Sequence, residues 1–206
     1  YEKSGTNDDS FAYRTYDGTT ISSEITRTAT EQAAVTPYFK LIPKPGTDEI
    51  MLIIFDYGAT TRRAMAILWN GTAFDNSTKL IVNNTADPAE EYIDFVWEGV
   101  SGDGLFAYGD GGSGGTTHAY RTYDSSTKTW SNVGTIEDVG TAVNKLALCS
   151  DPTSDYIGFI RQDGADDVNA SVWNGTTWLS SGLAEDPTTE VAPGQARGID
   201  CAWVAS

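Results

Sequence analysis

The chain has 206 residues, of which 29 are acidic and 13 basic, so its formal net charge is −16. Such a surface repels phosphate backbones and anionic membranes, which excludes sequence-independent nucleic-acid binding and argues against membrane attachment. Hydrophobic residues make up 39% of the chain, enough for a packed core, and no apolar run approaches the roughly 20 residues of a spanning helix.

Short apolar runs rich in aromatic and β-branched residues follow one another along the chain, separated by Gly, Pro, Asp and Ser clusters. Runs of this kind are typical of strands, and no segment shows a sustained apolar period of 3.6 residues. We therefore expect an all-β protein with almost no helix. The expected strands, in chain order, are 10–16, 39–42, 50–55, 65–69, 92–97, 104–108, 128–131, 145–149, 156–160, 168–173, 176–178 and 199–203.

The chain contains two copies of one long unit. Residues 11–17 (FAYRTYD) recur as residues 118–124 (HAYRTYD), and Pro45–Ile50 matches Pro152–Ile157, both at an offset of 107. Later segments match at offsets of 104 and 106, as in the two Trp-Asn-Gly-Thr turns at Trp69 and Trp173. An internal period of this kind is the signature of a repeat architecture.

Each long unit contains two related halves, each with an aromatic-(Asn/Asp) turn. These turns begin at Tyr16, Trp69, Tyr123 and Trp173, and those at 16, 69 and 173 continue with Gly. Asn and Gly tolerate positive φ, so an Asn-Gly pair between two apolar runs predicts a tight β-hairpin.

Four short strands in every 50-odd residues predict β-propeller blades, here four blades of two alternating kinds within one domain or a fragment of one. The approximate blades are 1–36, 37–88, 89–140 and 141–190, and residues 191–206 start a further blade or complete the first. A β-sandwich is the alternative. Most of one second strand is missing between the register of Ser206 and that of Tyr1. This favours a piece cut from a longer array, and closure of a composite blade by the two ends is the other possibility.

The blades, with Pro45–Ile50, Trp69–Thr72 and Trp173–Trp178, resemble β-propeller repeats of very large secreted or cell-surface proteins of bacteria and archaea. The resemblance spans the chain, and its motifs are structural. It implies display, adhesion or assembly at the cell surface rather than a known reaction, with other copies or neighbouring domains of the same protein as partners.

Residues 172–178 (VWNGTTW) are also similar to the Trp-Asp-Gly-x-Gly-Trp turns of fucose-binding propeller lectins. The likeness implies sugar binding between blades by an Arg, a Glu and a Trp, and Arg161 and Trp178 match two of these. No Glu stands at the third place, near Asn169–Ser171, and Arg161 has no counterpart in the other blades, where Asp56 and Tyr108 lie nearby in register. Trp130 and Trp178 are the aromatic residues expected to be exposed for stacking on a sugar ring.

Catalytic constellations are scarce. His118, the single histidine, has Phe11 as its repeat equivalent, so we interpret it as a strand position that accepts an aromatic ring rather than as a base. Arg14 and Arg121 are repeat equivalents, and we expect them to pair with Asp17 and Asp124 rather than to clamp a substrate carboxylate. Abundant Asp and Glu make paired carboxylates an unspecific signal for glycoside hydrolysis.

Metal and covalent features are weak as well. Three acidic loops, at 8–9, 102–104 and 163–167, are candidate Ca²⁺ sites, although solvated loops are the favoured interpretation and no cofactor is expected. Cys149 and Cys201 fall in the first strands of successive blades, where we favour two buried thiols over a disulfide. Five Asn-x-Ser/Thr sequons are candidate glycosylation sites: Asn70, Asn76, Asn83, Asn169 and Asn174.

The sequence therefore favours a non-enzymatic, extracellular structural or adhesive module of a larger surface or filament-forming protein. A carbohydrate-binding propeller is the first alternative, and a non-catalytic fragment of a secreted hydrolase is the second. The acidic surface fits a crowded secreted array, because like charges keep neighbouring copies soluble.

Overall fold

The computed structural model describes residues 10–28, 35–57, 62–84, 93–110, 117–136, 143–163, 168–185 and 199–204. Within these ranges the chain forms fifteen strands and no helix, which confirms the all-β prediction. The same ranges accordingly hold no helix that is long and apolar enough to cross a membrane.

The strands form four antiparallel sheets in chain order. The first pairs β1 (Ser10–Tyr13) with β2 (Ile25–Thr28). The second is a meander of β3 (Val35–Pro43), β4 (Glu49–Tyr57), β5 (Arg62–Asn70) and β6 (Phe74–Asn84). The third contains β7 (Ile93–Trp97), β8 (Gly104–Asp110), β9 (Thr117–Asp124) and β10 (Thr129–Trp130), and β11 (Gly134–Ile136) pairs with β9. The fourth is a meander of β12 (Val143–Ser150), β13 (Ile157–Asp163), β14 (Val168–Trp173) and β15 (Trp178–Glu185).

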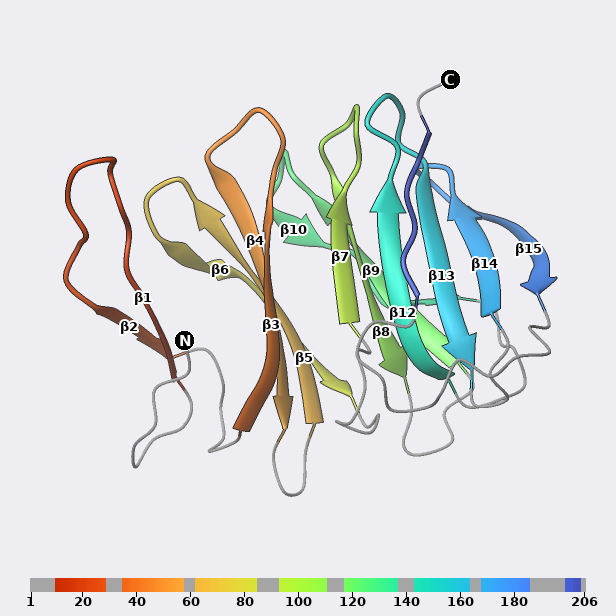
Figure 1. The fold of residues 1–206 in the computed structure, drawn as a ribbon, viewed down its shortest axis with the longest axis horizontal. Helices are drawn as coiled ribbons and strands as arrows, with labels where there is room; N and C mark the ends of the chain where they lie inside the picture. Colours follow the sequence, from red (N-terminus) through yellow and green to blue (C-terminus); the bar gives the residue numbers. More distant parts are fainter. Residues whose placement is uncertain are drawn as a thin grey trace.

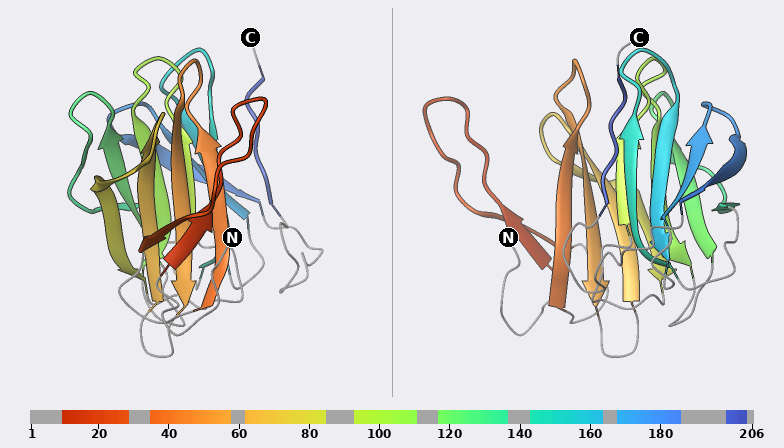
Figure 2. Two further views of the ribbon diagram at one scale, coloured as in Figure 1. Left: turned by 90° about the vertical axis from the view of Figure 1, so that its left-hand side faces the viewer. Right: turned by 45° about the vertical axis from the view of Figure 1, so that its right-hand side comes forward.

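The sheets stand side by side along the molecule, from β1–β2 at one end to β12–β15 at the other (Figure 1). The first strands of the three larger sheets, β3, β7 and β12, lie toward the same side, and we call them the inner strands (Figures 1 and 2). The segment 199–204 runs along β12 in Figure 1. The blade boundary predicted at residue 37 falls inside β3, which begins at Val35. The other predicted boundaries lie outside the described residues.

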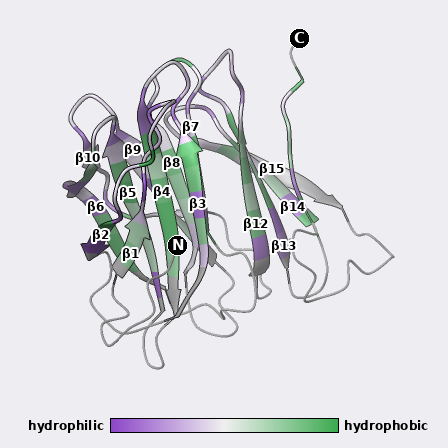
Figure 3. Cartoon of the chain, turned by 60° about the vertical axis from the view of Figure 1, so that its left-hand side comes forward, coloured by the Kyte–Doolittle hydropathy of each residue, from purple (hydrophilic) through white to green (hydrophobic). Residues whose placement is uncertain are grey.

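The core lies between the sheets. One cluster of buried side chains joins β4 and β5 to β7, β8 and β9, and a second joins β8 to β12, β13 and β14. The second strand β4 is apolar along most of its length because it is covered on both faces, and in Figure 3 it is green. β13 turns purple toward its end, where Arg161 and Gln162 lie buried. This difference between equivalent strands locates the candidate site described below.

The two predicted Asn-Gly hairpins are confirmed. Gly71 and Gly175 both have a φ of 93°, which only glycine adopts without strain. Asn70 Oδ1 accepts the N–H groups of Thr72 and Ala73, at 3.1 and 3.0 Å. Asn174 repeats this arrangement in the other turn. The turn is therefore fixed by an amide cap and by one residue with positive φ.

Arg14 and Arg121 are structural, but their predicted partners are wrong. Their guanidinium groups donate to the backbone carbonyls of Ser22 and Ser131, at 3.0 and 2.6 Å. Asp17 and Asp124 instead cap their own turns by accepting backbone N–H groups. The prediction failed because a carboxylate three residues from an arginine serves its local turn first.

Cys149 and Cys201 form a disulfide, so the favoured prediction of two thiols is wrong. Their Cα atoms lie 5.7 Å apart, because 199–204 runs beside β12. The segment 199–204 itself forms no strand, so the prediction of a strand at 199–203 is wrong. At the equivalent place in the preceding pair of sheets, Ile42 and Phe95 are apolar and pack in the same core cluster. One junction is therefore held by apolar packing and the next by a covalent bond.

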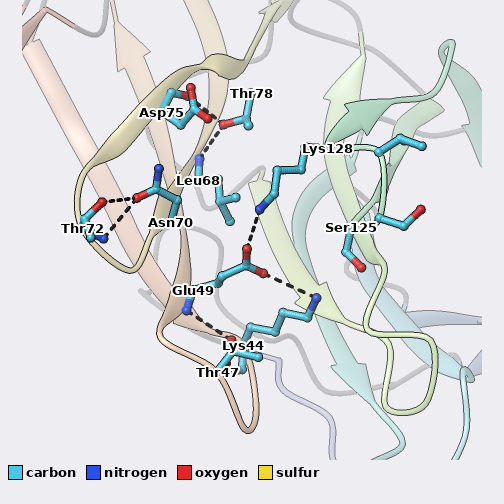
Figure 4. A network of polar contacts seen from close by, with 12 residues as sticks. Lys44, Thr47, Glu49, Leu68, Asn70, Thr72, Asp75, Thr78, Ser125 and Lys128 are labelled. Atoms are coloured by element: carbon cyan, nitrogen blue, oxygen red, sulfur yellow. Dashed lines mark hydrogen bonds and ion pairs between the residues drawn. The ribbon is translucent and has the colours of Figure 1, made fainter.

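The inner strands are also joined by a repeated hydrogen bond. Trp97 Nε1 donates to the carbonyl of Ile42 at 3.1 Å, and Trp203 Nε1 donates to the carbonyl of Cys149 at 2.8 Å. The outer parts are joined by ion pairs: Glu49 on β4 contacts Lys44 at 3.5 Å and Lys128 at 2.6 Å (Figure 4). Lys128 belongs to the next sheet, so this carboxylate links two sheets.

Candidate functional site

Two equivalent inter-sheet interfaces can be compared position by position. In the first, Phe11 and Tyr13 of β1 pack against the β4–β5 face, which presents Leu52, Ile54 and Ile67. In the second, the equivalent strand β9 packs against the β13–β14 face. The strand registers correspond, because Ile54 pairs with Met65 in the first sheet and Arg161 pairs with Asn169 in the second.

Four positions that are apolar in the first interface are polar in the second. His118 replaces Phe11 and Arg161 replaces Ile54 at the offset of 107. On the neighbouring strand, Asn169 replaces Met65 and Ser171 replaces Ile67 at the offset of 104. We call these residues and the adjoining Trp178 the polar cluster: His118, Arg161, Asn169, Ser171 and Trp178. Their joint replacement at one interface makes the polar cluster the main candidate site.

The polar cluster surrounds Phe159. The His118 ring lies 5.2 Å from the Phe159 ring and the Trp178 ring lies 5.7 Å from it, between ring centroids. Arg161 Cζ stands 5.8 Å from the same ring centroid. Arg161 is 1% exposed and Ser171 is 5% exposed, so these two side chains are enclosed between the two sheets, whereas Asn169 and Trp178 are half-buried.

The electrostatics of the polar cluster keep His118 neutral. Complete burial, with a smaller contribution from the charge of Arg161, lowers the pKa of His118 to about 3. A neutral imidazole offers one N–H donor and one acceptor nitrogen. The ring does not change its protonation state across the physiological pH range, so His118 is a hydrogen-bonding group rather than a proton carrier.

Several polar atoms of the cluster lack a partner within the part of the chain that the structure describes. They are both ring nitrogens of His118, Ser171 Oγ and Trp178 Nε1. Buried polar atoms are nearly always hydrogen-bonded, because an unsatisfied one costs about 1–3 kcal/mol. Four such atoms at one interface form a site that can donate to and accept from a polar molecule.

The structure brings together both residues of the predicted sugar site. Arg161 and Trp178 each lie beside Phe159. The expected exposure of Trp178 and Trp130 is wrong, since both are half-buried. Trp178 packs on Tyr120 and Trp173, and Trp130 donates its indole N–H to the carbonyl of Thr78 at 2.7 Å. Tryptophan after a hairpin turn covers the neighbouring sheet because its apolar area is better buried there than left in water.

Arg161 has no equivalent arginine, as the sequence indicated. Its counterpart at the offset of 107 is Ile54, and Asp56 lies two residues further along the same strand. Sequence reasoning missed His118, Asn169 and Ser171 as one group, although the signal was present. Aligning the two copies residue by residue shows all the polar replacements on two neighbouring strands and the strand that faces them.

A second polar site lies between the inner strands. A small pocket of about 40 Å³ is lined by residues of β3, β7, β12 and by Ile199 and Asp200. Lys40 Nζ and Asp94 Oδ1 form an ion pair there at 2.7 Å. Asp94 Oδ2 accepts the backbone N–H of Leu148 at 2.9 Å, so this carboxylate is fully used in holding three inner strands together.

The acidic loops give no metal centre in the described ranges, where no three potential ligands of a metal ion gather. Asp103 Oδ1, in the loop at 102–104, accepts the backbone N–H of Ser125 at 2.9 Å and so serves the neighbouring turn. Asp8, Asp9 and residues 164–167 lie outside the described residues. The described part of the chain therefore shows no calcium site.

The predicted glycosylation sequons occupy different environments. Asn70 and Asn76 are exposed, and Asn174 is half-buried. The side-chain oxygens of Asn70 and Asn174 cap their turns. Asn169 is half-buried on β14 within the polar cluster, and the side chain of Asn83 lies outside what the structure describes. Glycosylation stays a prediction for all five.

Known proteins give few matches. No model of a known protein family matches the chain, and no curated protein matches it. A solved structure, described as SapL1 lectin in complex with alpha methyl fucoside, is similar to it with a TM-score of 0.48 and 18% sequence identity. The match covers 71% of this chain and 46% of that chain, so this chain spans about half the length of the lectin.

Proposed function

We propose that the four sheets are successive blades of a β-propeller-type repeat, and that the chain is a non-enzymatic, extracellular structural or adhesive module of a larger surface protein. The repeated inner-strand contact carries this proposal. Trp97 and Trp203 make the same hydrogen bond to the first strand of the preceding sheet. Residues that recur most clearly in the sequence thus hold sheet against sheet rather than form a reaction centre.

The disulfide supports the extracellular setting. Cys149 and Cys201 are bonded, and structural disulfides persist in oxidising compartments. The surface also carries a large excess of negative charge, which keeps closely spaced copies apart in solution. A display module needs a rigid, soluble body of this kind more than it needs a cleft.

An experiment on intact native cells tests this function. An antibody raised against the chain should label cells that have not been permeabilised, and mild protease treatment of those cells should remove the signal. A membrane-impermeant thiol reagent should label Cys149 and Cys201 only after reduction. Signal confined to permeabilised cells, together with free thiols in the native protein, would show that the module is not displayed.

Carbohydrate binding is the second candidate function, and the polar cluster is the observation that favours it. Sugars are recognised by convergent hydrogen-bond donors and acceptors beside an aromatic ring. The cluster supplies the Trp178 indole N–H, the Ser171 hydroxyl and the His118 imidazole around Phe159. Because His118 and Ser171 are buried, binding to them requires the β9 side of the interface to separate from the β13–β14 face.

The internal repeat provides a matched variant for the test. Replacing His118→Phe, Arg161→Ile, Asn169→Met and Ser171→Ile rebuilds the apolar interface that the same chain already contains at Phe11, Ile54, Met65 and Ile67. This variant should stay folded, as melting followed by circular dichroism would show. On a glycan array the natural chain should bind defined saccharides and the variant should not. Equal binding by the two, or none by the natural chain, would remove this candidate while leaving the structural one standing.

A further inference from the structure

β3 exposes two large apolar side chains whose counterparts in the second copy are buried. Phe39 is 51% exposed and Leu41 is 54% exposed. Their equivalents on β12, Leu146 and Leu148, are 4% and 6% exposed. We call Phe39 and Leu41 the β3 face. Equivalent strands thus differ in what covers them rather than in their chemistry.

The cover on β12 comes from the sheet that begins with β7. Leu146 and Leu148 share a core cluster with Leu105 and Ala107 of β8, and Val96 of β7 packs against that cluster. Asp94 adds a polar link by accepting the N–H of Leu148 at 2.9 Å. By analogy, the β3 face is the surface on which a segment equivalent to β7 would pack.

The segment 199–204 resembles β7 in sequence and in its contacts, although it forms no strand itself. Residues 199–203 (IDCAW) match 93–97 (IDFVW). Asp94 and Asp200 each accept the N–H of the next residue, at 2.8 and 2.9 Å. Trp97 and Trp203 each bond the preceding inner strand. One side of the segment is thus attached to β12, as one side of β7 is attached to β3.

The other side of the segment carries Asp200, which is the equivalent of the aspartate through which β7 contacts β12. Asp200 is exposed, whereas Asp94 is 6% exposed in its place between two sheets. In the described part of the chain, the Asp200 carboxylate accepts a hydrogen bond from the neighbouring residue Cys201. The second oxygen of Asp94 is the one that binds the next inner strand.

We propose that the β3 face is a docking surface for residues 199–204 of a second copy of this chain. In this contact Asp200 of one copy accepts the backbone N–H of Leu41 of the other, and Ala202 packs on the β3 face as Val96 packs beside Leu148. The two surfaces lie on different parts of the chain, so the contact is head-to-tail and builds rings or rows of copies rather than a face-to-face pair. It stands whether the module displays, adheres or binds sugar.

The charge pattern suits this contact. The chain repels its copies over most of its surface, with a formal net charge of −16. Association therefore needs a specific apolar surface, and Phe39 and Leu41 form one on an inner strand. Exposed apolar side chains that adjoin one another on a soluble protein mark interaction surfaces more often than isolated ones do.

Light scattering after size exclusion, with sedimentation velocity over a range of concentrations, tests the proposal. The natural 206-residue chain should associate, and Leu41→Asp should raise its dissociation constant at least tenfold. Val133→Asp is the matched control, since Val133 is 56% exposed away from the β3 face and the added charge is the same. Thermal melting confirms that both variants are folded. A natural chain that is monomeric at every concentration, or a Leu41→Asp chain that associates as well as the control, overturns the proposal.

Cross-linking defines which surfaces meet. One chain carries Leu41→Cys and another carries Ala202→Cys, and mild oxidation of the mixture should give a covalent pair that neither chain forms alone. The native cysteines are already bonded to each other, and peptide mapping distinguishes the new cross-link from exchange with them. If the mixed sample gives no pair, or a chain with both changes closes on itself without joining a second copy, the segment does not dock on another copy.

Discussion

The indole N–H of Trp173 donates to Oε1 of Glu98 at 2.8 Å, joining β14 to the end of β7 across the boundary between two sheets. Ser101 Oγ donates to the other oxygen of the same carboxylate. Burial raises the pKa of Glu98, although these two hydrogen bonds oppose the shift. Glu98 is thus a buried charge kept in place by two donors.

Glu98→Gln should leave the protein as stable as the natural chain at pH 7, or more stable. A raised pKa means that the folded state favours the protonated carboxyl. The stabilisation from the protonated Glu98 carboxyl is complete below the pKa of this group in the unfolded chain. It is lost as the pH rises through the pKa of the group in the folded protein. Gln keeps an oxygen for Trp173 without the buried charge. Urea unfolding at pH 7 measures this.

Glu98→Ala is the contrasting variant. It leaves the Trp173 N–H buried without its acceptor, so we expect a loss of about 1–3 kcal/mol in the free energy of unfolding. If Gln proves as damaging as Ala, the negative charge itself is required. The interpretation that an uncharged acceptor can replace the Glu98 carboxylate is then wrong.

Removal of the disulfide should lower stability without changing the fold. Cys149 and Cys201 are 52 residues apart in sequence, and a cross-link closing a loop of this length stabilises by about 2–4 kcal/mol, mainly by restricting the unfolded chain. The double variant Cys149→Ser, Cys201→Ser should therefore unfold at lower urea concentration. Reductant should shift the natural chain to the same midpoint and leave the double variant unchanged. An unchanged midpoint on reduction would mean that the bond restricts nothing.

The glycines of the two Asn-Gly turns should resist branched side chains. Gly71→Val and Gly175→Val should each cost on the order of 1–2 kcal/mol, because a β-branched residue disfavours positive φ. Gly71→Asn is the control, since Asn accepts this region more readily. Chemical denaturation compares the three. Equal stability of the Val and Asn variants would contradict the strain argument.

His118 should make the protein sensitive to mild acid. The unfolded side chain takes a proton near pH 6.5, whereas in the folded protein its pKa is lowered to about 3. Stability is therefore lost as the pH falls below 6.5, by at most about 1.4 kcal/mol per pH unit. His118→Phe, which copies the aromatic ring of Phe11, removes this sensitivity. Between pH 7 and pH 5 the natural chain should lose about 2 kcal/mol more than the variant, because effects of the carboxylates cancel in the comparison. Parallel losses in the two proteins would show that His118 already titrates normally.

The strands and hairpins could be predicted from sequence because their signals are local. The Asn-Gly pairs at 70–71 and 174–175 require positive φ wherever they occur, and an apolar run such as 50–55 needs burial on both faces. The aromatic role of His118 followed from Phe11 at the equivalent place, and the ring does pack edge-on against Phe159.

The failures concern contacts between sheets. The disulfide was missed because the repeat equivalents of its two cysteines are apolar. Ile42 and Phe95 fill the corresponding junction by packing, which suggested that Cys149 and Cys201 would also only pack. Trp130 is expected on the surface because the residue after a turn is exposed in an isolated hairpin. Its burial depends on the distance and angle of a neighbouring sheet, which the local sequence does not determine.

The disulfide also has a mechanical consequence for a protein pulled by its two ends. Force that unravels the fourth sheet cannot lengthen the chain between Cys149 and Cys201, since those Cα atoms stay 5.7 Å apart. Fully extended, the 52 residues would contribute roughly 170 Å. This length becomes available only after the disulfide is reduced. The gain in end-to-end length when such a unit unfolds under force would therefore be smaller under oxidising conditions than under reducing ones.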